Sequence, residues 1–214
     1  MGSIPRTSLV FLALLLPTIV AQAQTDELPP PAVQSTAQRH LGFFLRMELG
    51  ADYFHTAAPV AGGGSLSVEG PGVSFGLLLG GAVTEDWILA GDVWAYSALS
   101  LIGSNAGRSS SANSSTVQLM GVGLNVTHYF MPANVYVSFS PSAVLLSGND
   151  GHGSYSQTLL GFGGRASIGK EWWVSDHWGF GVALELAGGV NKDQGGVPTW
   201  STVSGGLAFT ATYN

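Results

Sequence analysis

The chain has 214 residues, no cysteine and a formal net charge of −6, with only 9% charged residues and 31 glycines. Lysine and arginine total seven and never cluster, which excludes a basic nucleic-acid-binding surface. The absence of cysteine excludes disulfides and thiolate metal sites, so stability must come from another source.

The N-terminus carries the pattern of a cleavable secretory signal. Arg6 precedes an apolar run over residues 9–20, and an Ala-Gln-Ala motif that ends at Ala23 supplies the small residues of a cleavage site. The run is short for the ~20 residues that a membrane-spanning helix needs, which makes an uncleaved anchor the weaker interpretation. We predict a signal peptide over residues 1–23 and a mature chain that begins at Gln24.

The pattern changes twice after the signal. Residues 24–40 are polar and proline-rich, without apolar periodicity, and we interpret them as a periplasmic lead-in. From residue 41 to the end, apolar residues alternate with small or polar ones, as they do in β-strands. We predict eight such strands, over residues 41–53, 73–83, 87–94, 117–130, 135–145, 160–168, 178–186 and 203–213. In the fourth strand, Val117 and Leu119 are out of phase with Val122, which predicts a bulge near Met120.

The connections between these segments alternate strictly between short and long. The short ones are tight turns over residues 84–86, 131–133 and 174–177, and the long, Gly/Ser-rich ones cover residues 54–72, 99–115, 147–156 and 191–198. Short turns at one end and long loops at the other are typical of a transmembrane barrel, whereas a soluble sandwich has no reason to segregate them. We predict an all-β fold, an eight-stranded antiparallel up-and-down transmembrane β-barrel (residues 41–214) with both termini at one end.

Aromatic residues concentrate beside the connections and predict two interfacial girdles. The residues assigned to the short-turn girdle are Trp87, Tyr129, Phe130, Trp172, Trp173, Trp178 and Tyr213. Those assigned to the long-loop end are Tyr53, Tyr96, Tyr155 and Trp200.

The hairpin over residues 169–181 and the alternating C-terminal segment over residues 206–214 resemble the OmpA/OmpX-like outer-membrane β-barrel domains. The resemblance covers residues 41–214 and implies a multi-pass protein of the Gram-negative outer membrane. It also implies contact with outer-membrane lipid and lipopolysaccharide, and recognition of a C-terminal aromatic residue by the barrel assembly machinery. Here Tyr213 is followed by Asn214, which departs slightly from that pattern. The resemblance names no partner for the external loops.

Some small barrels of this kind are enzymes that act on lipid A, but no residue set here matches one. Ser167 and Lys170 form the only Ser-x-x-Lys motif, and residues three apart in a strand point to opposite faces. His152 with Ser154 or Ser156 is a conceivable loop pair, in a region where serine is simply common. We therefore predict no enzyme, no catalytic residue, no cofactor and no metal site.

The strand phases place seven of the few charged residues on the inner face, where lipid contact is avoided. They are Arg46, Glu48, Asp52, Asp92, Arg165, Glu171 and Glu185. We interpret them as an ionic plug with Arg46 and Arg165 as cationic centres and Glu48, Asp92 and Glu185 as their partners. An eight-stranded lumen is just wide enough to be filled by side chains, which favours a structural or surface-interaction barrel. A narrow channel for small or apolar solutes remains the alternative.

Overall fold

The computed structural model describes residues 39–60, 62–99, 101–105, 108–112, 115–150, 152 and 154–214. The predicted signal peptide, and the predicted lead-in up to residue 38, lie outside the described residues. Within the residues that the structure describes, no helix is both long and apolar enough to cross a membrane.

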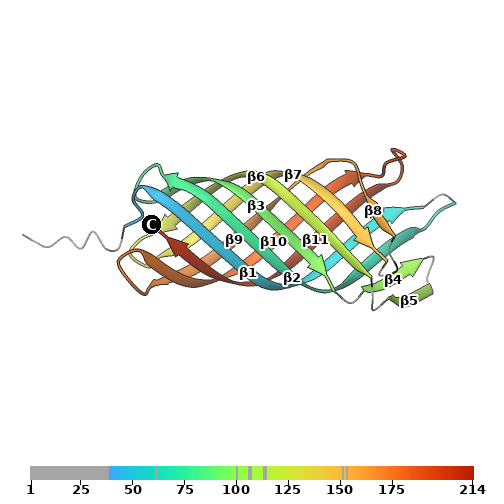
Figure 1. Cartoon of the computed structure of the whole chain (residues 1–214), viewed down its shortest axis with the longest axis horizontal. Helices are drawn as coiled ribbons and strands as arrows, with labels where there is room; N and C mark the ends of the chain where they lie inside the picture. The colour runs from blue at the N-terminus through green and yellow to red at the C-terminus, as the bar shows by residue number, and fades with distance from the viewer. Residues whose placement is uncertain are drawn as a thin grey trace, which may run out of the picture. The chain divides into compact units, whose positions relative to one another are not determined.

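Eight long antiparallel strands form the body of the described part (Figure 1). They are β1 (Phe43–Pro59), β2 (Ser65–Ala82), β3 (Trp87–Ala98), β6 (Thr116–Phe130), β7 (Val135–Asn149), β9 (Gly161–Trp173), β10 (Trp178–Lys192) and β11 (Thr199–Tyr213). Three short strands accompany them: β4 (Leu101–Asn105), β5 (Arg108–Ala112) and β8 (Tyr155–Gln157). Consecutive long strands pair with each other in chain order.

The sheet closes on itself through β1, which pairs with both β2 and β11. Leu45, for example, lies opposite Leu79 on one side and Tyr213 on the other. Closure satisfies the backbone groups that an open sheet would leave at its edges. The predicted fold class, an all-β antiparallel barrel of eight strands, is confirmed.

The two ends of the barrel differ in their connections. Residues 83–86, 131–134 and 174–177 form tight turns at the end where the C-terminus lies, which we call the short-turn end (Figure 1). The opposite end, which we call the long-loop end, carries the three short strands. There β4 pairs with β2, β5 pairs with β4, and β8 pairs with β7.

The strands reach further into the long-loop end than the sequence predicted. The sequence predicts a loop over residues 54–72, but residues 54–59 and 65–72 are strand, because the β1–β2 pairing continues to Pro59 and Ser65. Beyond Tyr53 the outward positions are no longer large and apolar, so the alternation that marks the lower strand is weak there. The inward side chains of Phe54 and Thr56 are nevertheless buried, and backbone pairing holds the extension together.

The predicted bulge near Met120 is wrong. β6 pairs with β3 without interruption from Val117 to His128. It pairs with β7 in the same register before Leu124 and after Asn125, and the pairing is continuous around Met120. Leu119 faces the interior and is 0% exposed, whereas Val122 faces outward and is 62% exposed. The apolar residues change phase because the interior itself becomes apolar toward the long-loop end, and the backbone stays regular.

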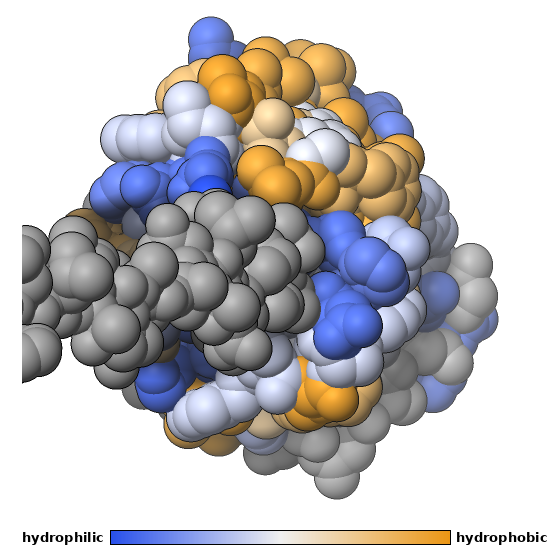
Figure 2. Space-filling model, turned by 90° about the vertical axis from the view of Figure 1, so that its left-hand side faces the viewer, coloured by the Kyte–Doolittle hydropathy of each residue, from blue (hydrophilic) through white to orange (hydrophobic). Residues whose placement is uncertain are grey.

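The outer surface is apolar along the strands. Leu79, in the outward apolar run of β2, is 54% exposed on this surface. A view onto the short-turn end shows hydrophilic residues on the end itself and hydrophobic residues around the flanks (Figure 2). This distribution is that of a barrel whose sides contact hydrocarbon and whose ends contact water.

Inward glycines make room for large lumen side chains. A Cβ at Gly169 would lie 2.6 Å from the Tyr136 ring, and one at Gly121 would overlap the Trp94 ring. A Cβ at Gly76 would lie 2.6 Å from a guanidinium nitrogen of Arg165. The abundance of glycine therefore reflects the filling of a narrow interior.

Candidate functional site

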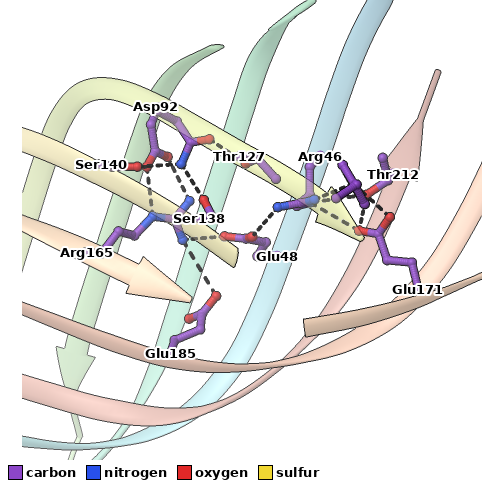
Figure 3. A network of polar contacts seen from close by, with 12 residues as sticks. Arg46, Glu48, Asp92, Thr127, Ser138, Ser140, Arg165, Glu171, Glu185 and Thr212 are labelled. Carbon is purple, nitrogen blue, oxygen red and sulfur yellow. Dashed lines mark hydrogen bonds and ion pairs between the residues drawn. The ribbon is translucent and has the colours of Figure 1, made fainter. Parts of the chain in front are cut away.

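The structure places all seven charged residues singled out in the sequence on the inner face, at 8% exposure or less. Six of them form one continuous set of ion pairs across the lumen (Figure 3). The seventh, Asp52, lies nearer the long-loop end and accepts a hydrogen bond of 2.9 Å from Ser204 Oγ.

Arg165, on β9, is the centre of the first half of this network. Its Nε and Nη2 donate to the two oxygens of Asp92, each at 2.8 Å, in the bidentate geometry that guanidinium and carboxylate groups favour. Its Nη1 contacts Glu48 and lies 3.6 Å from Glu185 Oε1. Carboxylates from β1, β3 and β10 thus converge on one cation.

Neutral polar side chains hold this cluster in place. Ser140 Oγ donates to Asp92 Oδ2 at 2.5 Å, and Asn125 Nδ2 donates to Ser140 Oγ at 2.7 Å. Tyr96 OH donates to Glu185 Oε2 at 3.0 Å. Asp92 is therefore oriented by β6 and β7, and Glu185 by β3, in addition to Arg165. Such hydrogen bonds are the condition under which buried charges are tolerated.

Arg46, on β1, is the centre of the second half, nearer the short-turn end. Its Nε lies 3.2 Å from Glu171 Oε1, and its Nη2 donates to Tyr129 OH at 2.5 Å. Tyr129 OH in turn donates to Glu171 Oε2 at 3.0 Å. The guanidinium also lies 3.8 Å from the centre of the Tyr136 ring, a cation–π contact.

Glu48 joins the two halves, because it contacts Arg165 and lies 3.9 Å from Arg46 Nη1. The predicted partners Glu48, Asp92 and Glu185 all surround Arg165. Arg46 has Glu171 as its nearest carboxylate, a residue that the sequence placed in the lumen without pairing it. The network within the described residues thus contains two guanidinium groups and four carboxyl groups.

His40, which belongs to the predicted lead-in, is buried at the short-turn end and packs on side chains of the lumen. Its ring stacks on Tyr129 with centroids 3.6 Å apart and lies 5.3 Å from the Trp173 ring. His40 Nε2 lies 3.0 Å from Asn134 Oδ1. Burial lowers the pKa of this imidazole below its ordinary value of 6.5, so its neutral form is favoured.

This arrangement corrects the predicted girdles. Tyr129 is 1% exposed inside the lumen, and Trp173 lies on the inner side of β9 beside His40. At the other end, Tyr96 is buried and Trp200 packs inward. These residues share the strand phase of the lumen charges, and nearness to a turn does not change that phase. On the outer side of the short-turn end, the exposed aromatic residues of the predicted set are Trp87, Phe130 and Trp172.

Above the network, toward the long-loop end, the lumen is filled by apolar side chains. Phe54, Trp94, Tyr96 and Leu119 are each at most 1% exposed and belong to one packed cluster. Trp94 Nε1 donates to Ser142 Oγ at 3.0 Å, so the cluster retains a polar anchor to β7. The sequence signal for this layer was the inward phase of Leu119, which was interpreted as a bulge.

The two residues of the Ser-x-x-Lys motif lie on opposite faces of β9. Ser167 faces inward, whereas Lys170 lies on the outer phase of β9 and donates to the carbonyl of Ala133 at 2.5 Å. In the loop after β7, Asp150 Oδ1 accepts the backbone N–H groups of His152 and Ser154, at 2.8 and 3.0 Å. These hydrogen bonds lower the pKa of Asp150, and they make it the acceptor of a turn.

No protein-family model matches the chain. No curated protein matches it either.

Several solved structures are similar in fold. Neisserial surface protein A is 16% identical, with a TM-score of 0.47, and the match covers 78% of this chain and 96% of that one. OprG from Pseudomonas aeruginosa is 8% identical, with a TM-score of 0.49 and coverage of 83% and 99%. AlkL, in lipid bilayers, is 13% identical, with a TM-score of 0.46 and coverage of 82% and 90%. OprG and AlkL are outer membrane proteins. The barrel fold of this chain is shown by its own strand pairing, in which eight long antiparallel strands close through β1 and β11.

Proposed function

We propose that the chain is a Gram-negative outer-membrane protein, a closed barrel with a structural or surface-interaction role and no catalytic activity. The short-turn end lies in the periplasm and the long-loop end faces outward, as in transmembrane barrels generally. The signal-like pattern of the N-terminal sequence and the apolar outer surface support this placement. External loops are the part of such a protein that other molecules can reach.

The observation that carries the proposal is the ion-pair network across the lumen. Arg46, Glu48 and Arg165 link opposite walls and are each at most 6% exposed. A solute that crossed this layer would have to separate buried ion pairs and leave charges without partners, at a cost of several kcal/mol, roughly 3–5 by comparison with other buried pairs. The network therefore acts as a plug.

The apolar flanks and the C-terminal strand each support a partner in the outer membrane. Outer-membrane lipid and lipopolysaccharide contact the apolar flanks, and the barrel assembly machinery recognises the last strand. In β11, Tyr213 lies on the outer side with its ring 5.3 Å from Trp178 and 6.2 Å from Phe43. This C-terminal aromatic group lies where β11 pairs with β1 to close the barrel, on the side that the assembly machinery can contact.

Planar-bilayer recording of the refolded protein tests the plug. We expect little steady conductance, because the network fills the cross-section. A large and stable single-channel current would overturn the proposal, most clearly if Arg165→Ala changed ion selectivity without loss of folding. The protein would then be a channel for small or apolar solutes, the second candidate, and the apolar side chains of the upper lumen would line the path.

Cell fractionation and gel mobility test the placement. The mature protein should begin at Gln24, sediment with the outer membrane and migrate differently before and after boiling, because a closed barrel resists detergent. Recovery in the soluble periplasm, or identical migration of heated and unheated samples, would contradict it.

A further inference from the structure

A cavity of about 150 Å³ opens at the long-loop end, inside the mouth of the barrel. Six strands contribute to its wall, β1, β2, β6, β7, β8 and β11. The apolar lining residues are Val68, Val117, Leu146 and Trp200, and the polar ones include Ser147, Ser156 and Asp193. We call this space the mouth cavity.

The floor of the mouth cavity is closed. Val68, Val117 and Trp200 pack downward against the buried cluster that contains Phe54 and Leu119. Below that cluster lies the ion-pair network around Arg165, Glu48 and Arg46. A molecule that enters the mouth cavity from outside therefore has no onward path and leaves by the way it came.

The residues that line the mouth cavity indicate which kind of ligand it can bind. Apolar side chains that face water at the mouth of a pore gain free energy when an apolar group covers them. A cavity of this size holds a single aromatic ring, as an apolar cavity of ~150 Å³ in another protein holds benzene. The hydroxyls of Ser147 and Ser156 offer hydrogen bonds at one side, and the carboxylate of Asp193 disfavours anions.

We propose that the mouth cavity binds a small neutral molecule built on one aromatic ring with a hydroxyl group. Trp200 supplies the aromatic wall, Val68 and Val117 supply the apolar wall, and the serine hydroxyls receive the ligand's polar group. This site goes beyond the closed-barrel function and makes the protein a binder of small aromatic compounds at the cell surface.

The test uses phenol as the probe and the side-chain indole resonances of the full mature protein in lipid nanodiscs. The chain has six tryptophans. Trp200→Phe identifies the Trp200 signal by its loss, and Trp87 and Trp172, on the lipid-facing side, report phenol that merely dissolves in the membrane. We expect a saturable shift of the Trp200 resonance at phenol concentrations that leave the lipid-facing indoles unchanged.

A matched pair of variants then locates the site. Val68→Trp fills the mouth cavity, and Val73→Trp places the same side chain on the outer face of the same strand. Val68→Trp should weaken phenol binding by more than about tenfold, a difference of ~1.4 kcal/mol, while Val73→Trp should leave it unchanged. Gel mobility before and after boiling checks that both variants fold.

Three outcomes would overturn the proposal. The first is equal phenol shifts in both variants, which means that phenol partitions into lipid. The second is a shift without saturation at any indole. The third is a Trp200 resonance that responds to lipid or detergent chain length instead of phenol, which makes the cavity an acyl-chain site. None of these outcomes depends on conductance, so the plug and the mouth cavity are tested separately.

Discussion

The two halves of the lumen are built from the same strands and filled with different chemistry. Toward the short turns, Arg46 and Arg165 hold four carboxyl groups together, and His40 covers the opening. Toward the long loops, Trp94 and Leu119 pack in a cluster that resembles the core of a soluble protein. Alternation along a strand decides which residues face inward, and position along the barrel axis decides what those residues are.

The charged half of the lumen blocks passage through the barrel, and the apolar half carries the mouth cavity. Ion pairs in a low-dielectric space are specific, because each charge needs its own partner, so the network holds the strands in one register and blocks the passage. Apolar packing is less directional and can leave a cavity where the barrel meets water. The charged half therefore holds the strands that form the mouth cavity. Substitutions in the two halves should lower the free energy of unfolding by different amounts.

The largest effect should follow from Arg165→Ala. Removal of this guanidinium leaves Asp92, Glu48 and Glu185 buried with no cation within hydrogen-bonding reach, apart from the distant contact of Glu48 with Arg46. We expect the free energy of unfolding, measured by urea titration in lipid, to fall by roughly 3–5 kcal/mol.

A substitution in the other half provides the comparison. Trp94→Phe removes one hydrogen bond, to Ser142, and keeps most of the apolar packing. Its cost should be nearer ~1 kcal/mol. Equal losses for Trp94→Phe and Arg165→Ala would show that the network is not the dominant stabilising feature of the lumen.

The next largest effect concerns the outer face. Leu79→Arg puts a charge on the lipid-facing side of β2, within the outward apolar run that includes Phe75 and Leu77, and should destabilise the barrel by roughly 2–4 kcal/mol. Val83→Arg, in the turn that follows the same strand, should cost only ~0–1 kcal/mol because its side chain reaches the interface. Equal stability of the two variants in lipid bilayers would mean that the outer face is assigned wrongly.

Much of this could be predicted from the sequence because β-structure has a period of two. The eight strands, the tight turns and the inward phase of residues such as Arg165 and Glu185 follow from alternation alone. Charge adds information, since a barrel in lipid can tolerate few charges outside. The pairing of Arg165 with Glu48, Asp92 and Glu185 can be predicted in this way, because few other charged residues lie at the same position along the barrel axis.

The remainder could not be predicted, because alternation does not say which phase is apolar. Val117 and Leu119 suggested a bulge only under the assumption that every apolar residue faces lipid. Tyr129 and Tyr96 were assigned to the rims by their distance from turns, yet both are buried in the lumen. The position of His40 depends on how the chain folds back over the short-turn end, and no local pattern encodes that.

A smaller effect should come from crowding in the wall. A Cβ at Gly80, on the inner phase of β2, would lie 2.5 Å from Ala90 Cα and would also meet the carbonyl of Leu89. Gly80→Ala should therefore destabilise by ~1–3 kcal/mol. Gly91→Ala, on the outer side of the neighbouring strand, adds the same methyl group where the nearest atom is 3.8 Å away, and it should be neutral or mildly stabilising. A reversed order in urea titration would contradict the proposed tight filling of the lumen.

The smallest effect concerns His40 and depends on pH. Its buried imidazole has a lowered pKa, so protons bind the unfolded chain more readily than the folded one, and stability is lost as the pH falls below 6.5 and through the lowered value. The groups that face it are Tyr129, Asn134, Asn214, Glu171 and Arg46. Asn134, Asn214 and Glu171 favour the imidazolium, and burial and Arg46 oppose it. His40→Gln keeps a polar side chain and removes this titration. Urea midpoints at about pH 8 and about pH 5 should therefore differ more for the native protein than for His40→Gln, since every other titrating group is common to both. Identical pH dependence would mean that His40 does not cover the short-turn end of the lumen in the membrane.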